Sequence, residues 1–217
     1  MSKYFQAMGL DVRHEAHGID GISSWYVVDE YRKRLVENFY GSKRRPIKAI
    51  HVVRNPLKVM ESMRRCEAIQ SRAALNIFRR MFPEFVHMEV NEIIAHWWVA
   101  WNKLARVRWD FCYTLQIEEA KREEVLDDLC CLTETRADKK VFKAILAIPE
   151  NTHTIEPYFN REIRKNNPEA MKPFTMDDVP EEAREDVAAL ACFFGYSPED
   201  LDLARGDLSC GLSVAHG

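Results

Sequence analysis

The run of residues 47–62 constrains the fold of this 217-residue chain more than any other stretch. Residues 47–53 are apolar with only two exceptions, which is typical of a central strand of a parallel sheet covered on both faces. Asn55 and Pro56 follow as a favoured helix cap and a favoured first helical residue. The strand is therefore predicted to lead directly into a helical stretch with breaks over 56–81. This pairing indicates an α/β layered fold with a small, mainly parallel sheet flanked by many helices.

Periodicity predicts the remaining elements. Two more strands are expected over 10–14 and 109–118, so three strands are evident, which is few for such a sheet. The clearest helix begins at Val90, where apolar residues recur at steps of 4, 3, 4 and 3. A helix is predicted over 2–8, closed by Gly9, and another from Ser23 or Ser24 to Gly41, with Val28, Tyr31, Leu35 and Phe39 on one face. Two more helices are predicted over 119–131 and 138–148. The last amphipathic helix contains Ala183, Val187, Leu190 and Phe194 and ends at Gly195, and a short helix is predicted after Ser197.

Length and composition define the class of protein expected. One domain over 1–205 is predicted, with a flexible tail over 206–217. The net charge of −3 gives no overall field toward nucleic acid or acidic membranes, and no run approaches the ~20 apolar residues of a membrane span. Six cysteines without a CxxC pair argue against a structural zinc site and fit a reducing cytoplasm.

Arg54 is the first candidate for a binding residue. At the carboxyl end of a central strand it is expected to face the crevice where open α/β sheets bind ligands. The helix that follows offers N–H groups and a dipole that favours an anion, and the guanidinium fork matches phosphate oxygens. Ser62, two helical turns further on, could add a hydroxyl. The alternative is that Arg54 pairs with a carboxylate and that Ser62 takes no part in binding.

The string Val53-Arg54-Asn55-Pro56-Leu57-Lys58-Val59-Met60-Glu61-Ser62 resembles the 3′-phosphate-binding motif of sulfotransferases that use 3′-phosphoadenosine 5′-phosphosulfate (PAPS). Residues 9–15 with 18–25 are similar to the second-strand region of bacterial and marine sulfotransferase-like proteins. Residues 98–102 with 116–119 are similar to the tryptophan helix and the glutamate-ending strand found later in these proteins. The resemblance covers about residues 3–148 and is weaker beyond. It implies a P-loop-NTPase-like fold in which Arg54 and Ser62 hold the 3′-phosphate of PAPS or of adenosine 3′,5′-bisphosphate.

The sequence also departs from the family. Sulfotransferases open with a strand and a Gly-rich loop that cradle the 5′-phosphosulfate, and here Ser2-Lys3-Tyr4 resembles only the end of that loop. We expect the first strand and its turn, about 10–15 residues, to be missing. Lys3 could retain a role in cofactor binding. A homodimer in which a partner chain supplies the strand is an open alternative, as is a start upstream of Met1.

The resemblance also suggests catalytic residues. Glu15, at the end of the second strand, is the expected base that takes a proton from an acceptor hydroxyl or amine, and His14 is the second candidate. The alternative is that His14 bonds a backbone carbonyl and Glu15 pairs with Arg13 or another neighbour. In the irregular stretch 149–177, Arg161 could close over the nucleotide. The tryptophans are expected in the core rather than in a sugar-stacking platform, and they are Trp97, Trp98, Trp101 and Trp109.

Three functions remain open from the sequence. The leading one is an enzyme that transfers sulfuryl from PAPS to a small-molecule or carbohydrate acceptor. The second is a non-catalytic, truncated member of the fold that keeps nucleotide or partner binding. The third is a P-loop kinase-like phosphotransferase, against which the absence of a GxxxxGK[ST] string counts.

Overall fold

A computed structural model describes residues 2–14, 17, 19–24, 26–41, 47–65, 80–85, 87–120, 122–146 and 172–203. These residues form a mixed α/β structure. Packing divides the chain into two compact units, which we name unit 1 (Met1–Val52 with Leu104–His153) and unit 2 (Val53–Lys103 with Thr154–Gly217). Each unit is assembled from two separated segments of the chain. The single domain predicted over 1–205 stays a prediction.

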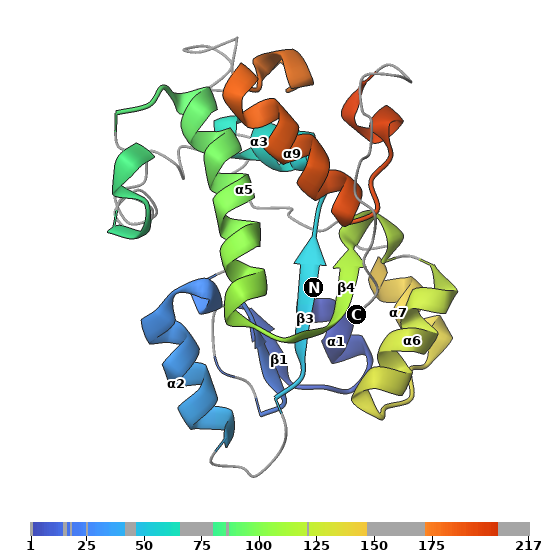
Figure 1. The fold of residues 1–217 in the computed structure, drawn as a ribbon. Helices are drawn as coiled ribbons and strands as arrows, with labels where there is room; N and C mark the ends of the chain where they lie inside the picture. Colours follow the sequence, from blue (N-terminus) through green and yellow to red (C-terminus); the bar gives the residue numbers. More distant parts are fainter. Residues whose placement is uncertain are drawn as a thin grey trace, which may run out of the picture. The chain divides into compact units, whose positions relative to one another are not determined.

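Unit 1 contains the strands (Figure 1). The last residue of β3 is counted with unit 2, as is most of α5, whose final turn belongs to unit 1. The elements of unit 1 are α1 (Ser2–Ala7), β1 (Val12–His14), β2 (Gly21–Ser23), the 3-10 helix η1 (Tyr26–Val28), α2 (Glu30–Gly41), β3 (Ala49–Val53), β4 (Phe111–Gln116), η3 (Ile117–Glu119), α6 (Glu123–Thr133) and α7 (Lys139–Leu146).

The strands pair two by two. β1 and β2 are parallel, with Val12 opposite Gly21 and His14 opposite Ser23. β3 pairs with β4, and the two arrows run in the same direction in Figure 1. The expected parallel pairing is thus present, but the described strands form two pairs rather than one sheet, and the sequence patterns missed β2.

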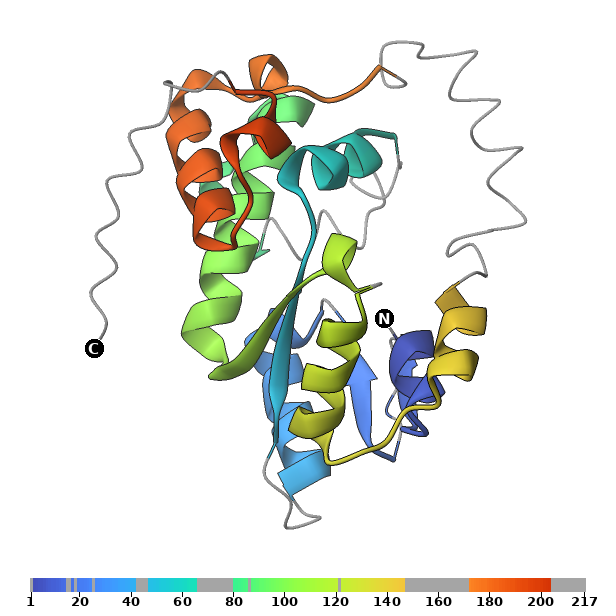
Figure 2. The ribbon, with the colours of Figure 1, turned by 90° about the vertical axis from the view of Figure 1, so that its right-hand side faces the viewer.

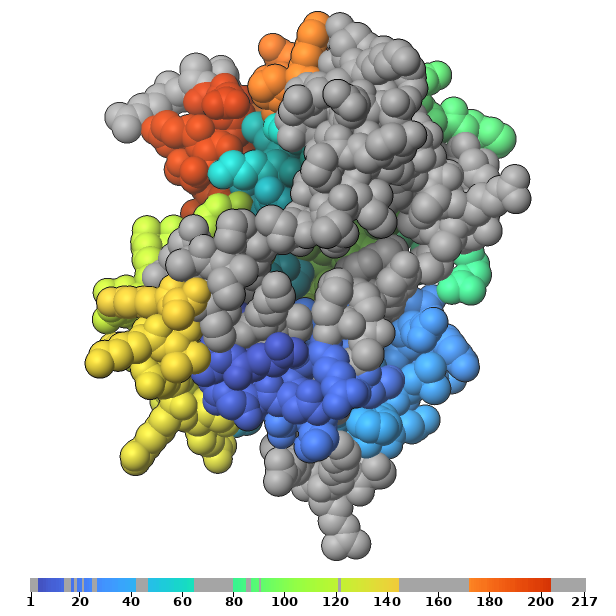
Figure 3. Space-filling view, turned by 180° about the vertical axis from the view of Figure 1, so that it is seen from behind, coloured from blue at the N-terminus to red at the C-terminus, as the bar shows by residue number. Residues whose placement is uncertain are grey.

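The core of unit 1 lies among α1, β4, α6 and α7. Tyr4 packs edge-to-face on Phe142, with ring centroids 4.6 Å apart. Figure 3, which views the chain from behind, shows α1 (dark blue) beside α7 (yellow). Leu115 of β4 and Leu126 of α6 complete the cluster, and both are almost fully buried. Because these apolar side chains leave water together, they stabilise the packing of short helices that would not be stable alone.

Unit 2 is helical (Figure 2). Helix α9 packs against α5 through Trp98 and Phe194, whose ring centroids are 6.2 Å apart, and through an ion pair of 2.9 Å between Lys103 and Asp186. Met60 of α3 is fully buried in the core. The elements of unit 2 are α3 (Pro56–Arg65), η2 (Pro83–Phe85), α5 (Val90–Arg108), η5 (Met176–Asp178), α9 (Glu181–Phe193) and η6 (Pro198–Leu201).

Several sequence predictions are confirmed. The strand of residues 47–53 is β3, and the helix begins at Pro56 as expected. The long helix begins at Val90. Gly195 follows α9 with φ of 87°, a left-handed conformation that glycine adopts without strain. Trp97 and Trp98 are buried, as predicted for core residues.

The start of α2 differs from the prediction. Ser23 ends strand β2, and neither it nor Ser24 caps the helix. The cap is Asp29, whose Oδ1 accepts the backbone N–H of Arg32 at 3.3 Å. An aspartate is as good a cap as serine. The prediction that a side-chain oxygen caps the helix is therefore correct, but the predicted position is wrong by five residues or more.

The buried face of α2 also differs. Tyr31 is 66% exposed and Phe39 is 42% exposed, although both belong to the apolar pattern that predicted the helix. Val36 is buried instead. Periodicity identified the helix correctly but not the side that packs inward.

In the part of the chain that the structure describes, no helix is long and apolar enough to cross a membrane. Nor do any three His, Cys, Asp or Glu side chains of these described residues gather as metal ligands would. The described cysteines with free thiols are Cys112, Cys130, Cys131 and Cys192.

Candidate functional site

The junction of β3 and α3 is a rigid turn in unit 2. Asn55 is buried and caps the helix, because its Oδ1 accepts the Lys58 N–H at 3.2 Å. Its Nδ2 donates to the Asp200 carbonyl at 2.7 Å, which ties the turn to η6. Pro56 is fully buried beside it. The backbone that carries Arg54 is therefore held on both sides.

Arg54 itself points to solvent. Its side chain is exposed, and its guanidinium makes no ion pair or hydrogen bond with any other described residue. A carboxylate partner, the alternative raised by the sequence, is thus not found among the described residues. An exposed, unengaged guanidinium on a fixed turn is available to an anionic ligand.

Ser62 lies in α3, the helix that follows Arg54, and is half-buried. Between Arg54 and Ser62 lies Lys58, which the motif comparison did not single out. Residues four apart on a helix share a face, so Lys58 and Ser62 are neighbours on α3, and Lys58 is exposed. Its position at the fourth residue after Arg54 was the sequence signal that could have identified it.

The helix offers fewer backbone donors than expected. Pro56 has no N–H, and the Lys58 N–H is bonded to Asn55. Of the first three helical residues, Pro56, Leu57 and Lys58, Leu57 is the one whose backbone N–H could still donate to an anion. Binding of an anion here would therefore depend on the side chains of Arg54, Lys58 and Ser62 more than on the helix terminus.

Arg64, on the last turn of α3, has a different role. Its Nη2 donates to the carbonyls of Lys172 and Pro173 at 2.5 and 3.2 Å, and Nη1 lies 3.4 Å from Asp178. The guanidinium also lies 4.8 Å from the ring centre of Phe174. Arg64 joins α3 to the segment before η5 and is engaged within the protein.

The predicted catalytic residues lie in or next to unit 1. His14 is the last residue of β1, where its backbone is opposite Ser23 of β2. Glu15 lies outside the described residues. Arg13, one of the ion-pair partners considered for Glu15, is bound to Asp11, with Nε and Oδ1 3.0 Å apart, and this contact raises the pKa of the guanidinium.

The loop that follows β1 is anchored by two aspartates. Asp11 Oδ2 accepts the Ile19 N–H at 2.8 Å, and Asp20 Oδ2 accepts the Asp11 N–H at 2.8 Å. These bonds hold the residues just before β2 against the residue that precedes β1. The two strands therefore start side by side and run parallel, with a connection far shorter than the usual crossover.

The other two residues predicted to bind the cofactor are Lys3 and Arg161. Lys3 lies in the first turn of α1, in unit 1. Arg161 lies outside the described residues. Arg54 and Ser62 are thus the two predicted site residues that the described structure places near each other along the chain of unit 2, Arg54 in the turn before α3 and Ser62 in that helix.

Comparisons with protein-family models, with curated proteins and with solved structures found no match for this chain.

Proposed function

We propose that this protein is a PAPS-dependent sulfotransferase with a P-loop-NTPase-like fold, and that Arg54 and Ser62 hold the 3′-phosphate of the nucleotide. The observation that carries the proposal is the exposed, unengaged Arg54 on the capped turn between β3 and α3, eight residues before Ser62. The parallel pair of β3 and β4 and the helix that directly follows β3 support the fold assignment.

The proposed binding uses three side chains. Arg54 would donate two parallel hydrogen bonds to phosphate oxygens, the geometry that a guanidinium forms best. Ser62 would donate its hydroxyl, and Lys58 would add a positive charge beside them. Glu15 is the proposed base and His14 its alternate, acting on an acceptor hydroxyl or amine.

Calorimetry with adenosine 3′,5′-bisphosphate tests the site. We expect the Arg54→Ala variant to lose about tenfold to 100-fold in affinity, because a hydrogen bond to a charged group contributes about 1.5–3 kcal/mol. Ser62→Ala should lose about fivefold. Adenosine 5′-monophosphate, which lacks the 3′-phosphate, should bind wild type and Arg54→Ala equally.

Arg34→Ala is the matched control. Arg34 is an exposed arginine of α2 that pairs with Glu30 at 3.2 Å, so its removal changes the net charge as Arg54→Ala does. Its affinity for the bisphosphate should equal that of wild type. Equal affinity in Arg54→Ala and wild type would reject the site assignment.

A further inference from the structure

A pocket in unit 1 lies apart from the residues discussed so far. It measures about 180 Å³ and opens between the segment that follows β2 and helix α2. For scale, an apolar cavity of ~150 Å³ is large enough to hold a benzene ring. The pocket is lined by His17, Ile22, Ser24, Val27, Arg32, Leu35 and Val36.

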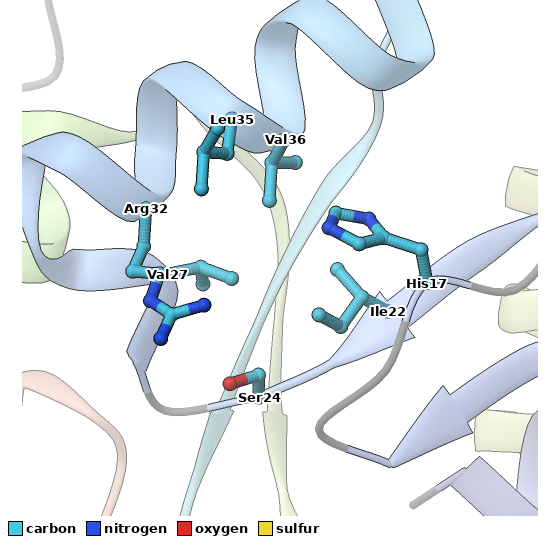
Figure 4. Close-up of a pocket in the computed structure, with 7 residues that line it drawn as sticks. All are labelled: His17, Ile22, Ser24, Val27, Arg32, Leu35 and Val36. Atoms are coloured by element: carbon cyan, nitrogen blue, oxygen red, sulfur yellow. The ribbon is translucent and has the colours of Figure 1, made fainter.

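The polar groups of the pocket are separated by apolar walls. Figure 4 shows the guanidinium of Arg32 and the hydroxyl of Ser24 directed toward each other at one side. The imidazole of His17 lies at the other side. The side chains of Ile22, Leu35 and Val36 lie between these ends. A ligand that fits this arrangement has a polar group at each end and an apolar body.

Arg32 gives the pocket its charge preference. It is the first of three consecutive basic residues on α2. Lys33 pairs with Glu37 at 3.5 Å, and Arg34 pairs with Glu30 at 3.2 Å. The guanidinium of Arg32 makes no ion pair or hydrogen bond with any described residue.

The nearest acidic residues are engaged elsewhere. Glu30 contacts Arg34 and also Arg108, at 3.2 and 3.7 Å. Asp29 Oδ1 accepts the backbone N–H of Arg32 as the helix cap. Arg32 lies in the first turn of a twelve-residue helix, where the dipole also favours a negative group. Among the residues that the structure describes, no acidic side chain therefore forms an ion pair with the Arg32 guanidinium.

At the other end of the pocket, aromatic contacts hold the imidazole of His17 in place. The His17 ring lies 4.6 Å from the ring of Phe39 and 5.8 Å from that of Tyr40, measured between centroids. These contacts orient the imidazole toward the pocket. A neutral imidazole can donate to or accept from a hydroxyl.

We propose that this pocket binds a small organic anion of the hydroxyaryl carboxylate class. The carboxylate lies against Arg32 and Ser24, the ring lies among the apolar side chains, and the hydroxyl meets His17. This inference does not depend on the proposed nucleotide site, since all lining residues belong to unit 1 and binding requires no nucleotide.

The test uses 4-hydroxybenzoate as probe with the full chain, followed by calorimetry and by amide chemical shifts in NMR. We expect saturable binding with shifts at the pocket residues. The uncharged 4-hydroxybenzamide should bind at least about tenfold more weakly, and Arg32→Gln should weaken the carboxylate probe by about the same factor.

Two further variants complete the design. Arg34→Gln, on the same helix and paired with Glu30, should leave the affinity unchanged. His17→Phe, which keeps a ring beside Phe39, should abolish the preference for 4-hydroxybenzoate over benzoate. No binding to wild type, equal binding of the amide, or full affinity in Arg32→Gln would each overturn the proposal. Because adenosine 3′,5′-bisphosphate is absent from the assay, these outcomes are independent of the test at Arg54.

Discussion

Arg54 lies two residues before α3 and Arg64 lies in its last turn, and the surroundings of these two arginines differ. Arg64 has a side chain only 11% exposed, and it binds two carbonyls and Asp178. Arg54 is exposed and engages no described residue. An arginine that makes no contact within the described structure is the better candidate for ligand binding, because its donors are available to a ligand.

Substitution of the two arginines should separate these roles. Arg64→Met keeps the aliphatic stem but leaves the carbonyls of Lys172 and Pro173 without this donor, so we expect the free energy of unfolding to fall by about 1–3 kcal/mol. Arg54→Met should change it by less than about 0.5 kcal/mol. Urea titration followed by circular dichroism measures both. A loss in Arg54→Met as large as that in Arg64→Met would show that Arg54 is structural.

Asn55 makes two bonds that a single substitution removes. Asn55→Ala eliminates the cap of α3, worth about 1 kcal/mol, and leaves the Asp200 carbonyl without its 2.7 Å partner. We expect a total loss of about 2–3 kcal/mol in urea unfolding. Lys58→Ala serves as control, since it retains the capped N–H and should change stability by less than about 0.5 kcal/mol. Similar values for the two variants would contradict this account of the turn.

The buried hydroxyl of Tyr4 should make the stability of the folded state depend on pH at high pH. Its side chain is 2% exposed, and no partner for its hydroxyl lies among the described residues. Burial, with smaller contributions from Cys130 and Tyr113, raises the pKa of this hydroxyl. In the unfolded chain tyrosine ionises near pH ~10. Above that pH the unfolded state therefore binds fewer protons than the native state, and stability is lost as the pH rises.

Tyr4→Phe should remove this sensitivity. At pH ~8 the variant should be as stable as wild type or slightly more stable, because an unbonded hydroxyl leaves the core. Between pH ~8 and pH ~10.5 the melting temperature of wild type should fall more steeply than that of Tyr4→Phe. Tyr31→Phe, at a position 66% exposed, is the control and should follow wild type. Parallel pH profiles for wild type and Tyr4→Phe would rule out the buried hydroxyl as the cause.

At the scale of elements, the sequence predicted what depends on local chemistry. Three features could be predicted from the sequence: the long helix from Val90, the cap at Asn55 and the glycine after α9. Each depends on residues within a few positions of one another. The short helix expected after Ser197 is η6, and it begins with a capping box of Ser197 and Asp200. What could not be read is which face of an element packs inward, because that depends on residues distant in the chain.

Helix α2 illustrates this limit and can be tested. Its apolar residues fall on more than one side, so the pattern alone allowed Tyr31 and Phe39 to face inward, whereas Val36 is the buried one. Tyr31→Ser should change stability by less than about 0.5 kcal/mol, while Val36→Ala should cost about 1–2 kcal/mol. Thermal or urea unfolding of the two variants measures the difference. A larger loss of stability in Tyr31→Ser than in Val36→Ala would show that the face predicted from periodicity is the buried one.

At the scale of the whole molecule, the candidate site was only partly predictable. Arg54 lies in the turn that leads into α3 and Ser62 lies in α3, so their relation follows from spacing in the sequence. The pocket around Arg32 and His17 could not be predicted in this way, since it requires α2 to pack beside the segment after β2. Short-range spacing therefore identifies a phosphate-binding motif more readily than a pocket built from separate elements.

The remaining question is whether the chain catalyses sulfuryl transfer or only binds nucleotide, and Glu15 separates the two. If it is the base, Glu15→Gln keeps the size of the side chain but cannot accept the acceptor's proton. Turnover of sulfate-labelled PAPS should then fall by about 100-fold or more, the usual contribution of a general base. The affinity for adenosine 3′,5′-bisphosphate should not change, because the proposed phosphate contacts belong to Arg54 and Ser62. Wild type that binds the bisphosphate but transfers no sulfate to any hydroxyl or amine acceptor would instead identify a non-catalytic nucleotide-binding protein, and unchanged turnover in Glu15→Gln would transfer the role of base to His14.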